Sequence, residues 1–125
     1  MNVLLVDDEA DIRLLLASVL RRKGIGSISA SSLAEALEAL AIGHFDAIFL
    51  DIHLPDGIGY DLIPTIRSKD PGTKVIAISA VDGERATALR AGVDMFLPKP
   101  FNGDLVLKKL TALLPSADQS TSHHA

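Results

Sequence analysis

Short apolar runs alternate along this chain with segments of helical spacing, and this alternation limits the fold to very few classes. Four runs are too short for helices and contain few polar residues, as expected of strands that are buried on both faces of a sheet. Between the runs, apolar residues recur at helical spacing, as at Leu16, Val19 and Leu20. The runs occupy residues 3–6, 47–50, 75–78 and 95–97.

A fifth run, residues 26–30, is half polar and alternates apolar with polar residues. That pattern is typical of a strand with one face near solvent at the edge of a sheet. Five strand–helix units in succession predict an α/β domain with a doubly wound, five-stranded parallel sheet and helices on both faces. We expect the strand order 2-1-3-4-5, which makes the first and third strands neighbours.

Polar residues and glycines mark the expected helix ends. Ser32 and Glu35 have the spacing of a capping box, and Asp82 and Asn102 are placed as N-caps. Glycine after a helix accommodates the left-handed conformation that often ends it. Three glycines are expected at helix C-terminal stops: Gly24, Gly43 and Gly92.

The later helices are less regular than the first two. We expect the third helix to begin near Tyr60, so that Pro64 lies where a missing N–H costs little. A short fourth helix at 83–91 has few large apolar residues, which predicts weak anchoring and a plausible output surface. The last helix is expected at 103–114.

Length and composition fit one domain with a polar end. Residues 1–115 are expected to form the domain, and residues 116–125 lack apolar periodicity, which predicts a disordered tail or linker. The tail histidines, His123 and His124, receive no role. The hydrophobic share of 48% argues against general disorder, and no apolar run approaches the roughly 20 residues of a membrane span.

Charge and residue types exclude several function classes. Twelve Lys and Arg against sixteen Asp and Glu give a net charge of −4, a poor match for direct contact with nucleic acid. Without cysteine the chain has neither disulfides nor thiolate metal ligands. The first residues enter an apolar strand without the basic region or cleavage site of a secretory signal, so we expect a cytoplasmic protein without membrane contact.

Five polar side chains lie where the expected strands end. Asp7 and Asp8 follow the first strand, Asp51 follows the third, and Ser79 and Lys99 come after the fourth and fifth. In open parallel sheets, ligands bind outside the carboxyl ends of the strands, where the strand order reverses. We therefore expect the three aspartates to meet in one crevice, with the other two residues nearby.

A cluster of three carboxylates suits a metal ion. The charges repel one another and raise at least one pKa unless a cation offsets them. All-oxygen ligands favour a hard ion, and Mg²⁺ takes one or two carboxylates, several waters and a phosphate oxygen, so we expect Mg²⁺ rather than Zn²⁺. A carboxylate can also attack phosphorus to form an aspartyl phosphate, with Lys99 and Ser79 as donors to the transferring group.

Each of these residues also has a structural interpretation when taken alone. Asp7 and Asp8 would also cap the helix that follows them, and Asp51 would fit a polar turn after a strand. Ser79 and Lys99 would fit solvated loops. The joint pattern of all five favours a functional site over these separate interpretations.

Four short motifs contain or adjoin these five residues. The motifs are Val-Asp-Asp-Glu at 6–9, Asp-Ile-His-Leu-Pro-Asp-Gly-Ile-Gly at 51–59, Ser-Ala at 79–80 and Lys-Pro-Phe at 99–101. Together they resemble the receiver domain of response regulators in two-component systems, the chemotaxis regulators among them. The resemblance covers nearly all of residues 1–114 and implies a flavodoxin-like fold.

The resemblance implies a role for each site residue. Asp51 would be the phosphoacceptor, and Lys99 would contact the phosphoryl oxygens. Asp7 and Asp8 would hold Mg²⁺ together with Asp51 and the backbone carbonyl of His53. Because His53 stands at the mouth of this site, we expect its replacement to alter the lifetime of the phosphoryl group.

The same resemblance implies a conformational switch. Ser79 would hydrogen-bond the phosphoryl group and move, and Phe96 matches the aromatic residue that then swings inward. The family more often has Tyr at that position. Because Phe96 has no hydroxyl, we expect burial alone to set its rotamer. The family also commonly has a cis peptide at the position of Lys99-Pro100.

The function implied is a phosphoryl-accepting signalling switch, which is not an enzyme beyond slow self-catalysed phosphoryl transfer and autodephosphorylation. The phosphoryl donor would be a sensor histidine kinase or a histidine phosphotransfer protein, and the output would come from another domain or an effector protein. Two alternatives stay open. One is a Mg²⁺-dependent phosphatase with an aspartate nucleophile, which usually has a second acid where His53 stands; the other is a degenerate receiver that works only through protein interaction.

Overall fold

The main strands form one parallel sheet with the order expected from the sequence. The computed structural model of the protein describes residues 1–113. Five strands lie side by side in the order β2-β1-β3-β6-β7, and every pair in this sheet is parallel. Counted along the chain, this order is the predicted 2-1-3-4-5. The strands are β1 (Asn2–Val6), β2 (Gly26–Ala30), β3 (Ala47–Asp51), β6 (Lys74–Ser79) and β7 (Met95–Pro98).

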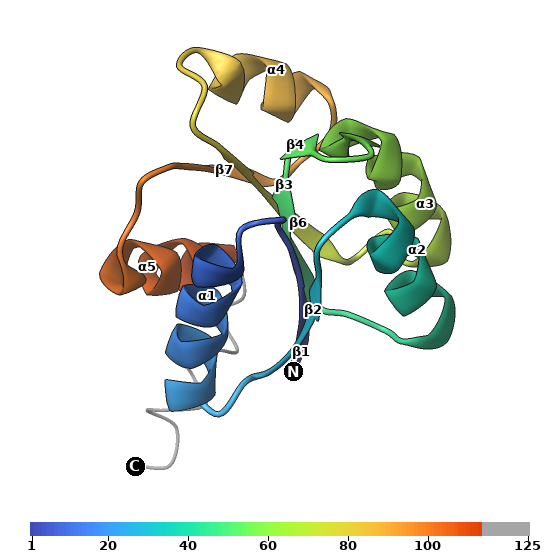
Figure 1. The fold of residues 1–125 in the computed structure, drawn as a ribbon. Helices are drawn as coiled ribbons and strands as arrows, with labels where there is room; N and C mark the ends of the chain where they lie inside the picture. Colours follow the sequence, from blue (N-terminus) through green and yellow to red (C-terminus); the bar gives the residue numbers. More distant parts are fainter. Residues whose placement is uncertain (114–125) are drawn as a thin grey trace.

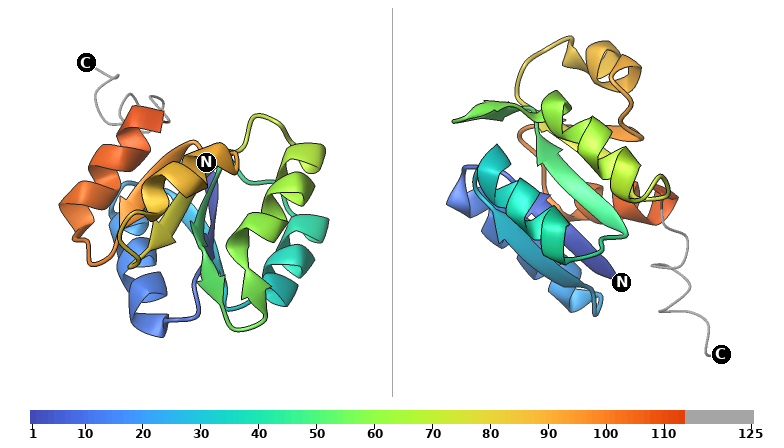
Figure 2. Two further views of the ribbon diagram at one scale, coloured as in Figure 1. Left: turned by 90° about the horizontal axis from the view of Figure 1, so that it is seen from above. Right: turned by 90° about the vertical axis from the view of Figure 1, so that its right-hand side faces the viewer.

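Helices cover both faces of this sheet. Figure 1 shows α1 and α5 on one face and α2 and α3 on the other, with α4 beyond the end of the sheet. The two views in Figure 2 show the same layers from above and from the side. The helices are α1 (Ala10–Arg22), α2 (Leu33–Ile42), α3 (Ile63–Lys69), α4 (Glu84–Arg90) and α5 (Gly103–Leu113).

Two apolar clusters, one on each face, bury the central strands. Successive side chains of a strand point to opposite faces. Val3 therefore packs in the cluster that contains Leu16 of α1, and Leu4 packs in the cluster that contains Leu40 of α2. Because helices cover both faces, the central strands need apolar residues at every position, which explains their lack of alternation.

Strand β2 lies at the edge of the sheet, as its half-polar sequence predicted. It pairs only with β1. Ile28, in the middle of β2, keeps 47% of its surface exposed. The alternating pattern of this strand therefore reflects its edge position.

Two of the predicted helix caps are present. Ser32 Oγ accepts a hydrogen bond from the Glu35 N–H at 3.1 Å, and Asn102 Oδ1 accepts one from the Leu105 N–H at 2.9 Å. The capping box is not complete, because the Glu35 carboxylate accepts from the N–H of Ser31, at 2.7 Å, and not from that of Ser32. The Glu35 carboxylate therefore bonds to the residue before the N-cap and not to the N-cap itself.

The predicted helix stops are found at all three glycines. Gly24 follows α1 with a φ of 74°, and Gly92 follows α4 with a φ of 105°, both in the left-handed region. At each site, the N–H groups of the glycine and of the next residue donate to carbonyls in the last turn of the helix. The Ile25 N–H, for example, donates to the Leu20 carbonyl at 3.0 Å. Gly43 caps α2 in an extended conformation.

The predicted cap at Asp82 is wrong. Helix α4 begins at Glu84, and the residue before it is Gly83, with a φ of 81° and no side-chain hydrogen bond to the helix. Gly83 accommodates a left-handed conformation that a β-carbon would strain. The turn is thus made by backbone conformation and not by a capping carboxylate.

The third helix also begins later than expected. A 3-10 turn (Gly59–Leu62) precedes α3, which starts at Ile63. Pro64 lies in the first turn, so the reason given for tolerating it holds although the start is wrong. A short antiparallel hairpin, β4 (His53–Leu54) and β5 (Gly57–Ile58), was not predicted from the sequence.

Other expectations concern the C-terminal part of the chain. The Lys99-Pro100 peptide bond is cis, as predicted. Helix α5 agrees with the predicted last helix as far as Leu113. The predicted tail at 116–125, with its two histidines, lies outside the described residues. Within residues 1–113, every helix is too short or too polar to cross a bilayer.

Candidate functional site

The carboxyl ends of neighbouring strands bring three acidic side chains together. Asp7 and Asp8 directly follow β1, and Asp51 is the last residue of β3, the strand beside it. One carboxylate oxygen from each lies within 4.8 Å of the others. Asp7 and Asp51 are buried, whereas Asp8 is exposed. This all-oxygen group could hold a metal ion.

Asp7 is the most deeply buried acid of the three. Its Oδ1 accepts a hydrogen bond from the Glu9 N–H at 2.8 Å. Its Oδ2 is buried and accepts no hydrogen bond within the described residues, although Lys99 Nζ lies 3.1 Å away. A buried anionic oxygen with an ion pair but no hydrogen bond is the kind of atom that a bound cation satisfies.

Asp51 lies between an acid that raises its pKa and a base that lowers it. Burial and the nearby charge of Asp7 raise the pKa of Asp51 to about 6. Lys99, whose Nζ lies 3.5 Å from Asp51 Oδ2, and the His53 N–H, which donates to Oδ1 at 3.1 Å, act in the opposite direction. The carboxyl group is therefore mostly ionised at neutral pH, close to its titration range.

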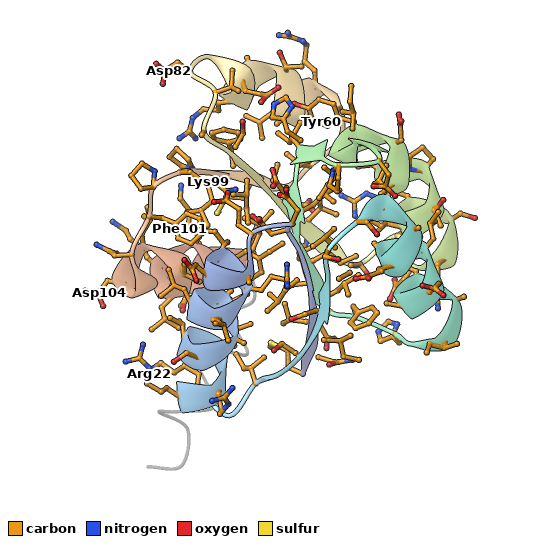
Figure 3. All side chains as sticks on the ribbon, in the orientation of Figure 1. Arg22, Tyr60, Asp82, Lys99, Phe101 and Asp104 are labelled. Carbon is orange, nitrogen blue, oxygen red and sulfur yellow. The ribbon has the colours of Figure 1, made fainter. Side chains whose placement is uncertain are left out.

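Lys99 is the cation of the site and forms ion pairs with three acids. Its Nζ lies 2.6 Å from Glu9 Oε1, in addition to its contacts with Asp7 and Asp51. Burial by itself would lower the pKa of Lys99, but the bond to Glu9 and the charges of Asp7 and Asp51 outweigh it and raise the pKa. Figure 3 shows Lys99 beyond the end of β7, above the first turn of α1.

Ser79 is the last residue of β6 and is buried beside α4. Its hydroxyl donates to Glu84 Oε1 at 2.6 Å and accepts from the Val81 N–H at 3.0 Å. The same Glu84 oxygen lies 2.9 Å from His53 Nε2. Burial would raise the pKa of Glu84, but the Ser79 and His53 bonds lower it overall.

Sequence reasoning did not identify Glu9 and Glu84 as part of this site. Glu9 is the final residue of the Val-Asp-Asp-Glu motif, and the motif does not by itself indicate a contact with Lys99. Glu84 is an acid in the first turn of a helix, which is a common arrangement without a functional role. The bond between Lys99 and Glu9 spans ninety positions of the chain. Only the assembled fold shows such partners.

An open cleft of about 260 Å³ lies beside Asp51. Its size is sufficient for a phosphate-sized group with water. The backbone and side chains that line it come from four strand ends. They are Asp8, Glu9, Asp51, His53, Ala80, Val81 and Lys99.

Phe96 lies in β7 opposite Ala77 of β6, and only 4% of its surface is exposed. It packs in the cluster beneath α4, and the guanidinium of Arg85 stands over its ring at 5.5 Å from the centroid. The expectation that burial alone sets the orientation of Phe96 is therefore incomplete, because a cation–π contact from α4 also holds the ring.

Fold and site together define a doubly wound parallel α/β protein with an acidic, lysine-bearing crevice at the carboxyl ends of its strands. The sequence profile of the response regulator receiver domain matches residues 3–111. The chain therefore belongs to the family of two-component response regulator receiver domains, consistent with a phosphoryl-accepting switch.

Individual relatives agree with this assignment. The chain is 39% identical over 125 residues to the response regulator protein PilR of Pseudomonas aeruginosa, covering 95% of this chain and 28% of that protein. A two-component response regulator from Clostridium difficile has a similar crystal structure, with a TM-score of 0.85, 30% identity and coverage of 92% and 96% of the two chains. The chemotaxis response regulator CheY4 of Vibrio cholerae follows at a TM-score of 0.84, 27% identity and coverage of 90% and 98%.

The chain spans about half the length, or less, of the curated relatives it matches. Those relatives are therefore much longer proteins that contain a similar domain. The solved structures of C. difficile and V. cholerae match over nearly their whole length.

Proposed function

We propose that Asp51 accepts a phosphoryl group from a phosphohistidine and that the resulting aspartyl phosphate changes the output surface of the protein. The observation that supports this most directly is the placement of Asp51. It is a buried carboxylate at the end of the central strand, beside Asp7 and the Lys99 ammonium, and it faces an open cleft. A phosphate-sized group can reach this carboxylate, while the surrounding protein limits access of bulk water.

The proposed step is a transfer between two nucleophiles. A carboxylate oxygen of Asp51 attacks the phosphorus of a phosphoimidazole, and a P–O bond forms while the P–N bond breaks. The electron pair of the broken bond stays on the imidazole nitrogen, which takes a proton from solvent. Asp51 must be ionised to attack, and a pKa of about 6 meets this condition at neutral pH. Lys99 would stabilise the charge on the phosphoryl oxygens.

We further infer that Mg²⁺ binds at this site. Asp7, Asp8, Asp51 and the backbone carbonyl of His53 would hold the ion. The donor set consists entirely of oxygen, and the buried Asp7 Oδ2 lacks a hydrogen bond, so these residues fit a hard cation. When bound, Mg²⁺ would offset negative charge on the transferring group. The protein's own part is to orient Asp51 through the His53 N–H and Lys99.

Ser79 and Phe96 would carry the signal away from Asp51. The Ser79 hydroxyl would turn toward the phosphoryl group, and the packing of Phe96 against α4 and Arg85 would change in response. Such a change is a shift of a pre-existing equilibrium, biased by the new bonds to phosphate. The Arg85 contact with the Phe96 ring supports a coupling between this residue and α4.

The proposed phosphoryl donors are a sensor histidine kinase or a histidine phosphotransfer protein. The output would come from a further domain or from an effector protein, and the net charge of −4 argues against direct contact of this domain with nucleic acid. We propose residues 1–115 as the receiver domain and the cytoplasm as its location.

The enzyme alternative has less support than the switch. A phosphatase with an aspartate nucleophile would use a second acid two residues after Asp51, and His53 occupies that place with its ring bonded to Glu84. We therefore propose that the protein does not turn over phosphomonoesters, and multiple turnovers of p-nitrophenyl phosphate would contradict this. A degenerate receiver that works only through protein interaction is disfavoured because three aspartates and Lys99 meet at one crevice.

The test is to incubate the protein with acetyl phosphate and Mg²⁺ and to measure its intact mass. We expect a mass increase of one phosphoryl group that requires Mg²⁺ and is lost in Asp51→Asn. Asp61→Asn is the matched control, because Asp61 is exposed and makes no hydrogen bond or ion pair among residues 1–113. An Asp51→Asn protein that is modified as fast as the wild type would overturn the proposal.

A further inference from the structure

The hydroxyl of Ser79 is already engaged in this structure. A serine hydroxyl has one proton to donate. Ser79 donates it to Glu84 Oε1 at 2.6 Å, while its oxygen accepts from the Val81 N–H. The hydroxyl cannot donate to Glu84 and to a phosphoryl oxygen on Asp51 at the same time. Glu84 and a phosphoryl group on Asp51 therefore compete for the same proton.

Glu84 also connects this site to α4. It is the first residue of that helix, its side chain is only 14% exposed, and its Oε1 meets His53 Nε2 as well as the Ser79 hydroxyl. Within α4 itself, Ala88 is the one buried residue. The Glu84 carboxylate is thus a principal attachment of the first turn of α4 to the carboxyl ends of the strands.

We propose that Glu84 is a latch, whose carboxylate holds Ser79 and His53 in the unphosphorylated protein and is displaced when Asp51 carries a phosphoryl group. A phosphoryl oxygen accepts the hydrogen bond that the Ser79 hydroxyl had donated to Glu84. The negative charge of the phosphoryl group also repels the Glu84 carboxylate. The first turn of α4 then loses its attachment. This inference rests on the proposed function and adds the residue that sets the balance between the two states.

A buried hydroxyl next to Glu84 is available to receive the displaced carboxylate. The Tyr60 hydroxyl is buried and makes no hydrogen bond with the described part of the chain. Burial raises the pKa of Tyr60, and the charge of Glu84 and its contact with the Tyr60 hydroxyl raise this pKa further. Figure 3 shows Tyr60 between β4 and α4. A hydroxyl donor that already lies beside Glu84 lowers the cost of moving the carboxylate away from Ser79.

The experiment measures the affinity for beryllofluoride, a stable phosphoryl mimic, at a fixed Mg²⁺ concentration. Because a hydrogen bond to a charged group must be broken on binding, we expect Glu84→Ala to bind the probe about tenfold more tightly than the wild type. Glu84→Gln keeps an acceptor but loses the charge, so its gain is smaller and in the same direction. Glu84→Gln also keeps the side-chain volume if the alanine variant folds poorly.

A charge control and a coupling control isolate the latch. Asp82→Ala removes an acid two residues earlier, which projects from the loop before α4 in Figure 3 and makes no hydrogen bond or ion pair within residues 1–113. We expect the affinity of this variant to equal that of the wild type. A Ser79→Ala protein has no hydroxyl to donate a hydrogen bond to Glu84. Adding Glu84→Ala to that protein is therefore expected to increase its beryllofluoride affinity only slightly.

Amide hydrogen exchange gives a second readout that does not depend on affinity. Beryllofluoride should speed exchange in residues 81–85 of the wild type, and Glu84→Ala should show the fast exchange without the probe. A wild-type protein that fails to bind beryllofluoride overturns the proposed function and the latch with it. A wild type that binds, together with a Glu84→Ala variant of unchanged affinity or a full gain in the Ser79→Ala background, overturns the latch alone.

Discussion

At the scale of single residues, Asp51 must meet two opposing requirements. Burial beside Asp7 places it where a phosphoryl group can be held away from bulk water, and the same burial raises its pKa to about 6. The Lys99 ammonium and the His53 N–H offset this only in part. Without a metal ion, the ionised form of Asp51 therefore lowers the stability of the folded protein.

This environment predicts how stability depends on pH in the metal-free protein. The pKa of Asp51 is about 6 in the folded state against an ordinary value of 3.8, so the folded state holds the proton more tightly than the unfolded state. The stabilising contribution of the proton is full below about pH 4 and is lost as the pH rises to about 6. Two pKa units correspond to roughly 2–3 kcal/mol. We therefore expect Asp51→Asn to be more stable than the wild type at neutral pH by about this amount.

Urea unfolding in EDTA at several pH values measures the effect. The difference in unfolding free energy between Asp51→Asn and the wild type isolates this one group from the other carboxylates that titrate nearby. It should grow between about pH 4 and pH 6 and stay constant above. A difference that does not change with pH would contradict the assigned pKa.

His53 gives a second prediction at this scale. Its ring lines the cleft beside Asp51 and is 54% exposed, so it stands where water must approach a phosphoryl group. Removing the ring opens this approach, and we expect His53→Ala to shorten the half-life of the aspartyl phosphate severalfold. Decay is followed by mass spectrometry between about pH 6 and 8, a range that includes the physiological pH. His44→Ala, an exposed histidine outside the cleft, is the control, and equal half-lives in all three proteins would rule out a role for His53.

At the scale of elements, the unpredicted hairpin β4–β5 keeps Asp51 in place. The Gly59 N–H, directly after β5, donates to the Ile52 carbonyl at 2.7 Å. The backbone of Gly59 lies so close to the end of β3 that a β-carbon would clash with the Asp51 carbonyl and approach Ile52 Cα to 3.1 Å. Only glycine allows the chain to return this closely past the proposed acceptor.

We therefore expect Gly59→Ala to act on both stability and the site. The clash is with backbone atoms that cannot move separately, so the substitution should cost about 1–3 kcal/mol. It should also weaken Mg²⁺ and beryllofluoride binding, because the end of β3 must shift. Gly26→Ala is the control, since a β-carbon there meets only Asn2 Oδ1 at an ordinary 3.9 Å. Thermal unfolding and beryllofluoride titration check both effects, and a Gly59→Ala protein that behaves like Gly26→Ala would disprove the packing argument.

The sequence predicted those elements whose signals are local. Apolar runs buried on both faces, such as β1 and β3, have a composition that helices rarely show at that length. Their alternation with helical segments predicted a doubly wound sheet, and the strand order was taken from that class of fold. The start of α3 and the β4–β5 hairpin were missed because a 3-10 turn and a two-residue strand carry almost no periodicity. In the site, strand ends predicted which aspartates meet, but Glu9 and Glu84 depend on contacts that form only when distant segments pack.

At the scale of the whole molecule, two apolar clusters on opposite faces of one sheet determine what the domain must contain. The cluster beneath α1 is completed by α5, whose Val106 and Leu110 are 0% and 1% exposed. The opposite cluster receives side chains from α2 and α3 and Ala88 from α4. All members of both clusters that the structure describes lie within 1–113, and the family match ends at residue 111. The described residues therefore supply both apolar clusters and every proposed site residue.

This arrangement predicts where the chain can be shortened. A protein that ends after Pro115 should keep the melting temperature and beryllofluoride affinity of the 125-residue chain, because it retains both clusters and every proposed site residue. A protein that ends after Asn102 loses α5 and exposes the cluster beneath it, so it should not fold. Because each large buried aliphatic removed costs about 2–5 kcal/mol, the lost contacts of Val106 and Leu110 alone rival the stability of a small domain. Thermal melts followed by circular dichroism compare the three chains. A large loss of stability on removal of residues 116–125 would contradict the proposed domain boundary. A folded protein without α5 would also contradict it.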